Sequence, residues 1–308
     1  MATRIQSRVA VATATAAALF MLAGCAAGAD TDTSSSAEPT EGGMPLPEFS
    51  QELHDSLPEE IQESGVLRLA TITLPPYSQK GEDGVTYEGI NFDTVAAMES
   101  ALGIEIDLEV APTSADIYTG FESDKYDAGI SPLSDIPATQ ANYDFAVWIA
   151  EYVVFLQQKT ADDKIEGLDD TCGHTIATLQ GGTAQKVLEA QQAECDTPID
   201  ISLFADQDTA ILAVKSGRAD AAFSSQIPLT YYVSQDDTLE ISGANSVDNG
   251  FPPFWVGAFA PKEAPIVPVL LDTFNALKDA GTYDFLLEKY GIEENAMDEF
   301  GFNLAEDE

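Results

Sequence analysis

Basic side chains are scarce in this sequence. Its 308 residues include 13 lysines and arginines against 53 aspartates and glutamates, which gives a formal net charge of −40 at pH 7. Contacts to nucleic-acid phosphates depend on lysine and arginine, so this balance argues strongly against a nucleic-acid-binding protein. The acidity helps to keep an exported protein soluble, but it carries no information about the fold.

Histidine is almost absent, with only His54 and His174 in the whole chain. The sequence contains no Ser-His-Asp arrangement, no histidine-rich metal cluster and no phosphate-binding glycine-rich loop ending in lysine. Paired carboxylates are too abundant in so acidic a chain to indicate a site by themselves. We therefore predict that the protein is not an enzyme and that it holds neither a cofactor nor a metal ion.

No apolar run is long enough to remain in a membrane. Val9 to Leu22 is apolar, follows Arg4 and Arg8, and is too short to span a bilayer. It ends in Leu-Ala-Gly-Cys at residues 22–25, which resembles the lipobox of bacterial lipoproteins. This resemblance implies that residues 1–24 are a signal peptide and that a lipid is attached to Cys25. An ordinary secretory signal with a chance cysteine is the alternative.

The segment after the cysteine lacks apolar periodicity. Residues 26–45 are small, polar and acidic, so they cannot bury enough surface to fold. We predict that residues 25–58 form a flexible tether to the outer face of the cell membrane. Roughly 250 residues follow, enough for one large lobe or two medium ones with proper cores.

Cysteine is also rare, with three in the chain. If Cys25 carries a lipid, Cys172 and Cys195 remain as a pair, which is consistent with a disulfide in an oxidising compartment. The loop that they would close is worth roughly 3 kcal/mol in the chain-entropy model. Two free thiols are the alternative, and the exported context disfavours it.

What the chain does contain is a regular alternation of strand and helix patterns, which predicts an α/β sheet with crossovers. The first unit has strands at 66–71, 104–110 and 126–130, with helices at 89–103 and 117–121. The second has strands at 175–179, 201–204 and 221–223, with helices at 184–191 and 208–216. Two amphipathic helices, at 266–279 and 283–290, complete the pattern.

Several segments, in order along the chain, resemble the type II periplasmic solute-binding proteins of amino-acid ABC importers, known as family 3. The matching segments lie at residues 65–103 (including Leu-Pro-Pro-Tyr-Ser at 74–78), 125–131, 143–145, 216–221 and 279–283. Cys172-Gly173 with Cys195 looks like the disulfide-bearing subgroup common among actinobacterial members. The resemblance extends from about residue 60 to about residue 295.

The resemblance implies an α/β fold of two lobes, with a ligand cleft between them and a hinge of two segments. It places lobe 1 at residues 59–159, lobe 2 at 160–249, and a return to lobe 1 with C-terminal helices at 250–308. The hinge would lie near 157–159 and 249–250. Closure of the lobes on the solute would allow a monomeric receptor to engage a membrane permease.

Family members grip an α-amino acid with an arginine for its carboxylate and an aspartate for its ammonium. The matching positions hold Thr139 and Ser225, and the only arginines beyond the signal peptide are Arg68 and Arg218. Burying a zwitterion without charged partners costs several kcal/mol. We therefore expect a different class of solute.

The remaining ligand-binding candidates are hydroxyls, aromatic rings and backbone amides. Tyr77 matches an aromatic ring over the ligand, and Gly182 with Thr183 forms a strand-to-helix turn whose amides favour an anionic or carbonyl group. The alternatives are that Tyr77 and Trp148 are core residues and that Gly182 with Thr183 forms a plain tight turn. The complete predicted set is Tyr77, Ser131, Ser134, Thr139, Trp148, Gly182, Thr183 and Ser225.

We thus predict an extracytoplasmic lipoprotein that binds a small polar, amino-acid-like or amine-bearing solute and passes it to a permease. A degenerate or sensory receptor that no longer takes small molecules is the alternative. A dehydratase-like enzyme on the same fold is the least favoured possibility.

Overall fold

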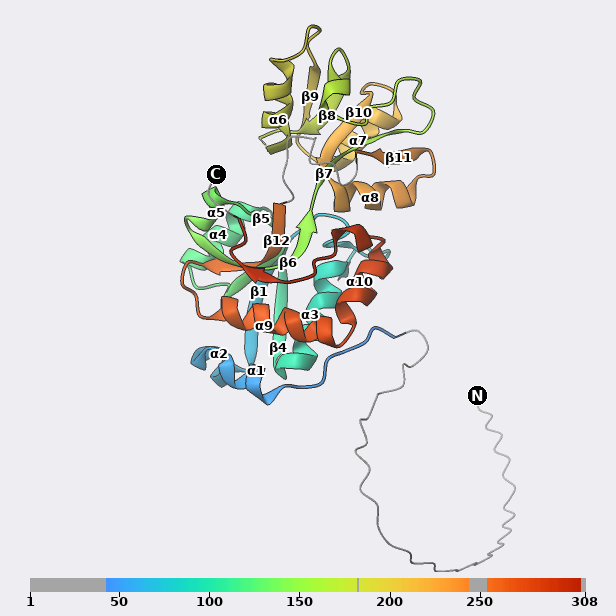
Figure 1. Ribbon diagram of the computed structural model, residues 1–308. Helices are drawn as coiled ribbons and strands as arrows, with labels where there is room; N and C mark the ends of the chain where they lie inside the picture. Colours follow the sequence, from blue (N-terminus) through green and yellow to red (C-terminus); the bar gives the residue numbers. More distant parts are fainter. Residues whose placement is uncertain (1–42, 182, 244–253, 306–308) are drawn as a thin grey trace, which may run out of the picture. The chain divides into compact units, whose positions relative to one another are not determined.

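Two separate β-sheets organise the computed structural model, which describes residues 43–181, 183–243 and 254–305 (Figure 1). The first has the strand order β13-β6-β12-β5-β1-β4 and the second the order β11-β7-β10-β8-β9. The strands of the first sheet are β1 (Val66–Ile72), β4 (Glu105–Ala111), β5 (Ala128–Asp135), β6 (Tyr143–Glu151), β12 (Phe254–Pro261) and β13 (Gly301–Phe302). The strands of the second are β7 (Val153–Gln158), β8 (Thr175–Leu179), β9 (Asp200–Phe204), β10 (Ala221–Ser225) and β11 (Leu239–Ser242).

Helices pack around both sheets, and a short β-hairpin precedes helix α3. Around the first sheet lie α1 (Gln51–Ser56), α2 (Glu59–Ser64), α3 (Ile90–Leu102), α4 (Ser114–Glu122), α5 (Pro137–Gln140), α9 (Ile266–Asp279), α10 (Thr282–Tyr290) and the 3-10 turn η3 (Glu293–Asn295). Around the second lie η1 (Leu168–Thr171), α6 (Thr183–Gln192), α7 (Gln207–Lys215) and α8 (Gln226–Gln235). The hairpin consists of β2 (Gln79–Lys80) and β3 (Tyr87–Glu88).

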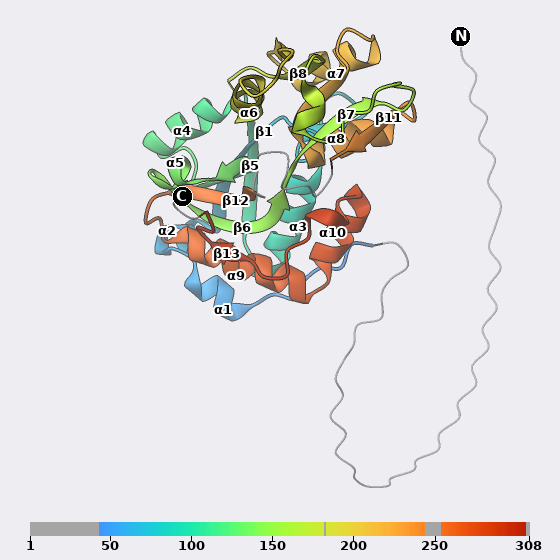
Figure 2. The same cartoon turned by 45° about the horizontal axis from the view of Figure 1, so that its top comes forward.

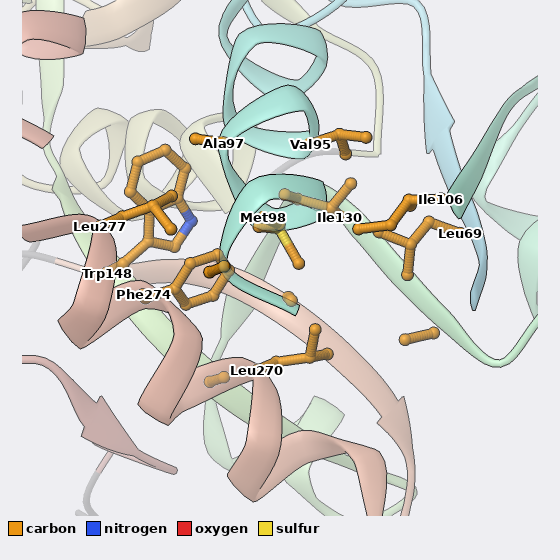
Figure 3. Packing of buried hydrophobic residues seen from close by; sticks show 14 of the residues in the cluster. Leu69, Val95, Ala97, Met98, Ile106, Ile130, Trp148, Leu270, Phe274 and Leu277 are labelled. Carbon is orange, nitrogen blue, oxygen red and sulfur yellow. The ribbon is translucent and has the colours of Figure 1, made fainter. Parts of the chain in front are cut away.

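The core of the first sheet is built where α3 and α9 pack on it. Figure 3 shows Met98 of α3, Trp148 of β6 and Phe274 of α9 within one cluster of buried side chains. The Trp148 ring stacks on Phe274 with centroids 5.3 Å apart and meets the edge of Tyr283 at 6.0 Å. Trp148 is 3% exposed, so the core alternative is the one that the structure shows for this residue.

The second sheet has buried side chains on both faces. One face packs Val154, Leu156 and Ala222 against α7, and on the other Phe155 stacks on Phe223 at 4.5 Å. A disulfide joins Cys172, directly after η1, to Cys195, just beyond α6, with Cα atoms 5.4 Å apart. The predicted pairing is therefore confirmed.

The chain passes from the first sheet to the second at a single residue. Strand β6 ends at Glu151 and β7 begins at Val153, so the crossing lies at Tyr152. The prediction of a crossing at 157–159 was wrong, because the long apolar run from Phe145 onward is two strands buried in different sheets. Figure 2 shows β6 leading into β7 beside α8. The second predicted hinge segment, 249–250, lies outside the described residues.

The folded part of the chain begins before residue 58, where the predicted tether was expected to end. Leu53, Leu57 and Ile61 are buried in the core of the first sheet, and the Ser50 N–H donates to the Ala101 carbonyl at 2.9 Å. Leu53 lies in α1, Ile61 lies in α2, and Leu57 caps the end of α1, so both short helices contribute to this core. His54 Nδ1 lies 2.9 Å from the Leu102 carbonyl, so this histidine also belongs to the folded part.

The predicted signal peptide and Cys25 lie outside the described residues. Within the described ranges, none of the helices has the length and apolar character that a bilayer crossing requires.

Candidate functional site

The turn before β2 places Tyr77 next to Glu151, the last residue of β6. Gly89 has φ 130°, and a Cβ at this position would lie 2.5 Å from the Pro76 carbonyl oxygen, so only glycine fits. The close approach lets the Ile90 and Asn91 N–H groups donate to the Pro76 and Tyr77 carbonyls, each at 3.0 Å. The start of α3 thereby fixes the turn that carries Tyr77.

Tyr77 itself is buried rather than displayed. Its side chain is 2% exposed, and its hydroxyl donates to Glu151 Oε2 at 2.8 Å. Burial and the nearby carboxylate raise the pKa of Tyr77 well above its ordinary value, so the hydroxyl keeps its proton. The prediction that this ring lies over a ligand is not supported, because the core alternative is what the structure shows.

Glu151 is a buried carboxylate at the end of β6. It is 1% exposed, and its Oε1 accepts a hydrogen bond from the Ile227 N–H at 2.9 Å. Burial raises the pKa of Glu151 to about 7, against the opposing effect of hydrogen bonds from Tyr77 and from the Ile227, Tyr152 and Gln226 backbones. Sequence reasoning missed this residue.

The first turn of α8 rests on this carboxylate. Ser225 stands at the N-cap position but makes no side-chain capping bond, so Glu151 accepts from an N–H that a cap would otherwise take. The Gln226 N–H donates to the Tyr152 carbonyl at 2.8 Å, and its buried side chain donates to Glu294 Oε2 at 3.2 Å. The Ser225 side chain is half-buried.

The turn after β5 carries the other candidate position. The Thr139 hydroxyl lies 2.8 Å from the Ser134 carbonyl and 2.9 Å from the Ile136 carbonyl, and it accepts from the Ile136 N–H at 3.1 Å. Thr139 thus closes its own turn. Ser134 is half-buried beside it, and the Ser131 backbone pairs with Gly257 of β12.

A second buried carboxylate fixes the same turn from another direction. Asp135 is 1% exposed and accepts from Gln140 Nε2 and the Leu304 N–H, both at 2.6 Å, and from the Ala305 N–H at 3.2 Å. Burial raises the pKa of this aspartate. The C-terminal segment therefore anchors the turn that carries Thr139.

The strand-to-helix turn after β8 is only partly described. Thr183 begins α6, while its side chain and all of Gly182 lie outside the description. The Gly181 N–H donates to Gln185 Oε1 at 2.7 Å, so one amide of this turn already has a partner. Within the described ranges, no group of three or more metal-ligating side chains is present.

The comparison with protein families decides the identity of this fold. The model of bacterial extracellular solute-binding proteins, family 3, matches residues 67–293. The chain belongs to this family. Family 3 members are solute-binding proteins, and the mixed α/β architecture with two sheets agrees with the predicted two-lobed fold.

Several similar proteins add detail to the family assignment. The arginine-binding protein ArgT of Corynebacterium glutamicum is 27% identical over 262 residues, which cover 82% of this chain and 83% of that protein. The structure of an ancestral cationic amino-acid solute-binding protein matches with a TM-score of 0.63 and 26% identity, over 75% of this chain and 98% of that one. A mutant arginine-binding protein from T. maritima matches at 0.62 and 23%, over 76% and 99%.

The predicted site residues fall into distinct groups in this family 3 protein. Ser134 lies near the end of β5, Thr139 lies in α5 directly after it, and Ser225 stands at the N-cap of α8. Tyr77 and Trp148 belong to the core. The signal that could have revealed Glu151 is its position as the only charged residue in the apolar run from Phe145 to Gln157.

Proposed function

We propose that this family 3 protein is the receptor of an ABC importer, and that it binds a small amine-bearing, cationic solute between its lobes and delivers it to the permease. The observation that carries the solute class is Thr139, whose hydroxyl is bonded within its own turn where the family resemblance places a carboxylate-binding arginine. Ser225 at the other anchor position adds to this argument. We infer that the receptor acts as a monomer outside the cytoplasm.

Charge supports a cationic solute. A net charge of −40 draws cations toward the protein. The relative from C. glutamicum is described as arginine-binding, and an ancestral neighbour as binding cationic amino acids. A buried carboxylate without a positive partner costs several kcal/mol, whereas an ammonium or guanidinium can be bound by hydroxyls and carbonyls. Ser131, Ser134 and Ser225 are the proposed contacts to the cationic group, and the Gly182 and Thr183 amides are the proposed contacts to a neutral carbonyl or other acceptor of the solute.

A matched pair of probes tests this proposal. Agmatine is arginine without its carboxylate, so the two compounds differ only at the group that Thr139 would fail to bind. In thermal unfolding we expect agmatine at a hundredfold excess over its Kd to raise Tm by about 5 °C, and arginine to raise it far less. An equal or larger shift with arginine would contradict the proposed solute class.

The reverse change sharpens the test. The double variant Thr139→Arg with Ser225→Asp restores both charged anchors of the family resemblance, and we expect it to bind arginine more tightly than the parent protein. Calorimetric titration with arginine and agmatine measures the change in preference. A double variant that prefers agmatine as the parent does would show that these positions do not read the solute.

We further propose that Cys25 carries a lipid and that the preceding residues are removed. The tether then covers residues 25–42, lobe 1 comprises 43–151 with 254–305, and lobe 2 comprises 153–243. Expression of Cys25→Ser in a bacterial host tests the anchor by fractionation. We expect the wild type in the membrane fraction and the variant outside it, and equal membrane retention would contradict lipidation.

A degenerate or sensory receptor is the second candidate, because both charged anchors of the family resemblance are absent at Thr139 and Ser225. Under this alternative, no amine, betaine or amino acid in a broad panel raises Tm, and no small molecule co-purifies with the protein. Stabilisation by any one of these compounds would favour the importer receptor.

A further inference from the structure

Three stretches that are distant in sequence meet at one carboxylate beside the crossing between the sheets. Glu151 accepts from the Tyr77 hydroxyl at 2.8 Å and from the Ile227 N–H at 2.9 Å. Tyr77 belongs to the turn held by α3, while Ile227 lies in the first turn of α8, which packs on β7, β10 and β11. Glu151 therefore connects the layers around the first sheet to a helix of the second.

The groups that face this carboxylate are few. Tyr77 is the titratable group from the turn before β2, and the backbone amides of Tyr152, Gln226 and Ile227 supply the remaining hydrogen bonds. Glu294 of η3 accepts a hydrogen bond from the Gln226 side chain, and the Gln226 backbone amide faces Glu151, so Gln226 lies between the two carboxylates. The β12 residue paired with Glu151 is the apolar Phe254. Among the described residues, no basic side chain forms an ion pair with Glu151.

We propose that Glu151 is a proton-dependent latch between the two sheets. It holds α8 against the junction of β6 and β7 most firmly when the Glu151 carboxyl group carries a proton. A protonated Glu151 donates from Oε2 to the Tyr77 oxygen and accepts from Ile227 with Oε1, so both contacts persist without a buried charge. The ionised form keeps the contacts but lacks a cationic partner, and it gains by moving into water.

The direction of the pH effect follows from linkage. In the latched arrangement burial raises the pKa of Glu151 to about 7, whereas a hydrated glutamate titrates near its ordinary value of about 4.3. The latched arrangement thus binds the proton more tightly, and rising pH favours release of α8. Between pH 6 and pH 8 the equilibrium between latched and released forms shifts about tenfold toward release.

This latch bears on solute capture only if the proposed receptor function holds, since movement at the crossing would then accompany closure of the lobes. Its own test needs no solute. Hydrogen exchange of the ligand-free protein, followed by mass spectrometry, reports opening of the peptide covering 225–231, including the Ile227 amide. Failure of the latch and failure of the receptor proposal are therefore separate results.

The experiment compares exchange at pH 6 and pH 8 after correction for the intrinsic chemical rate. In the wild type we expect opening of this peptide to increase about tenfold at pH 8. Glu151→Gln carries no titrating proton, so we expect less than a twofold change. Glu240→Gln is the matched control, since it removes an acid that pairs with Lys164 elsewhere, and it should keep the tenfold change.

Tyr77→Phe keeps the ring and removes the hydroxyl that donates to the carboxylate. Because this hydrogen bond lowers the pKa of Glu151, we expect the exchange transition to move to higher pH. The same pH dependence in Glu151→Gln as in the wild type would overturn the latch. Should Glu151→Gln fail to fold, an unchanged transition in Tyr77→Phe would overturn it equally.

Discussion

Asp135 and Glu151 end two strands that lie on either side of β12, yet they connect different parts of the molecule. Trp255 of β12 pairs with Asp135, and the neighbouring Phe254 pairs with Glu151, so both carboxylates lie at one edge of the first sheet. The donors to Asp135 come from α5 and the C-terminal segment, whereas one donor to Glu151 comes from α8 beside the second sheet. Burial alone thus does not define the role of a carboxylate, because the elements that supply its donors decide what it couples.

The largest expected difference concerns the pH dependence of stability. The pKa of Glu151 is raised to about 7 in the folded state, so the folded protein binds this proton more tightly than the unfolded chain. Stability from this group is present below its unfolded pKa and is lost as pH rises through about 7. We expect a loss of about 3 kcal/mol between pH 4 and pH 9.

Denaturant unfolding of the wild type and Glu151→Gln across this range isolates the effect, because the many other acids cancel in the difference. A wild type that gains stability relative to the variant as pH rises would contradict the assignment.

The second prediction concerns the turn that holds Tyr77 against Glu151. Gly89→Ala adds a Cβ 2.5 Å from the Pro76 oxygen at φ 130°, a conformation available essentially to glycine alone. We expect a loss of about 3 kcal/mol in the free energy of unfolding. The turn should also move away from Glu151. Gly84→Ala, where φ is also positive but nothing lies within 4 Å, is the control and should cost about 1 kcal/mol.

The third prediction concerns Asp135. Asp135→Asn turns an amide NH₂ toward one of the N–H donors, so we expect a loss of about 2 kcal/mol from the charge-assisted hydrogen bonds. Faster hydrogen exchange should appear in residues 301–305 and not in the first turn of α8. Faster exchange at α8 instead would remove the distinction between the two carboxylates.

The smallest expected effect belongs to Thr139. Thr139→Val keeps the shape of the side chain and removes the hydroxyl that closes the turn, which should cost about 1 kcal/mol. The Kd for agmatine should stay within twofold of the wild type, because this hydroxyl is bonded within the turn. A tenfold weaker affinity in calorimetry would instead show that Thr139 contacts the solute.

Periodicity alone predicted most of the regular elements. The strand at 175–179 and the helix at 266–279 agree with β8 and α9 to the residue, because a short run rich in β-branched residues before a glycine turn and a one-sided apolar helix face leave a clear mark in sequence. Helix α8 escaped prediction. It carries a proline at position 228 in its first turn and lacks a one-sided apolar face, since its first four residues are all buried.

The candidate site was less accessible to sequence reasoning. Family resemblance proposed Thr139 and Ser225 as candidate positions, but the hydrogen bonds that Thr139 makes within its turn cannot be read from residue types. Tyr77 and Trp148 were placed among the ligand candidates because an aromatic ring in sequence does not reveal which way it faces. Glu151 is one acid among 53 acidic residues, and only its surroundings in three dimensions distinguish it.

The self-contained turn after β5 has an evolutionary consequence. Its backbone bonds, from the Thr139 and Gln140 N–H groups to the Ile136 carbonyl, both 3.0 Å, do not depend on which side chain occupies position 139. Asp135 holds the turn independently from the C-terminal side. Under the proposed function, in which position 139 reads the solute, a lineage can exchange this one side chain while it inherits the backbone of the turn unchanged.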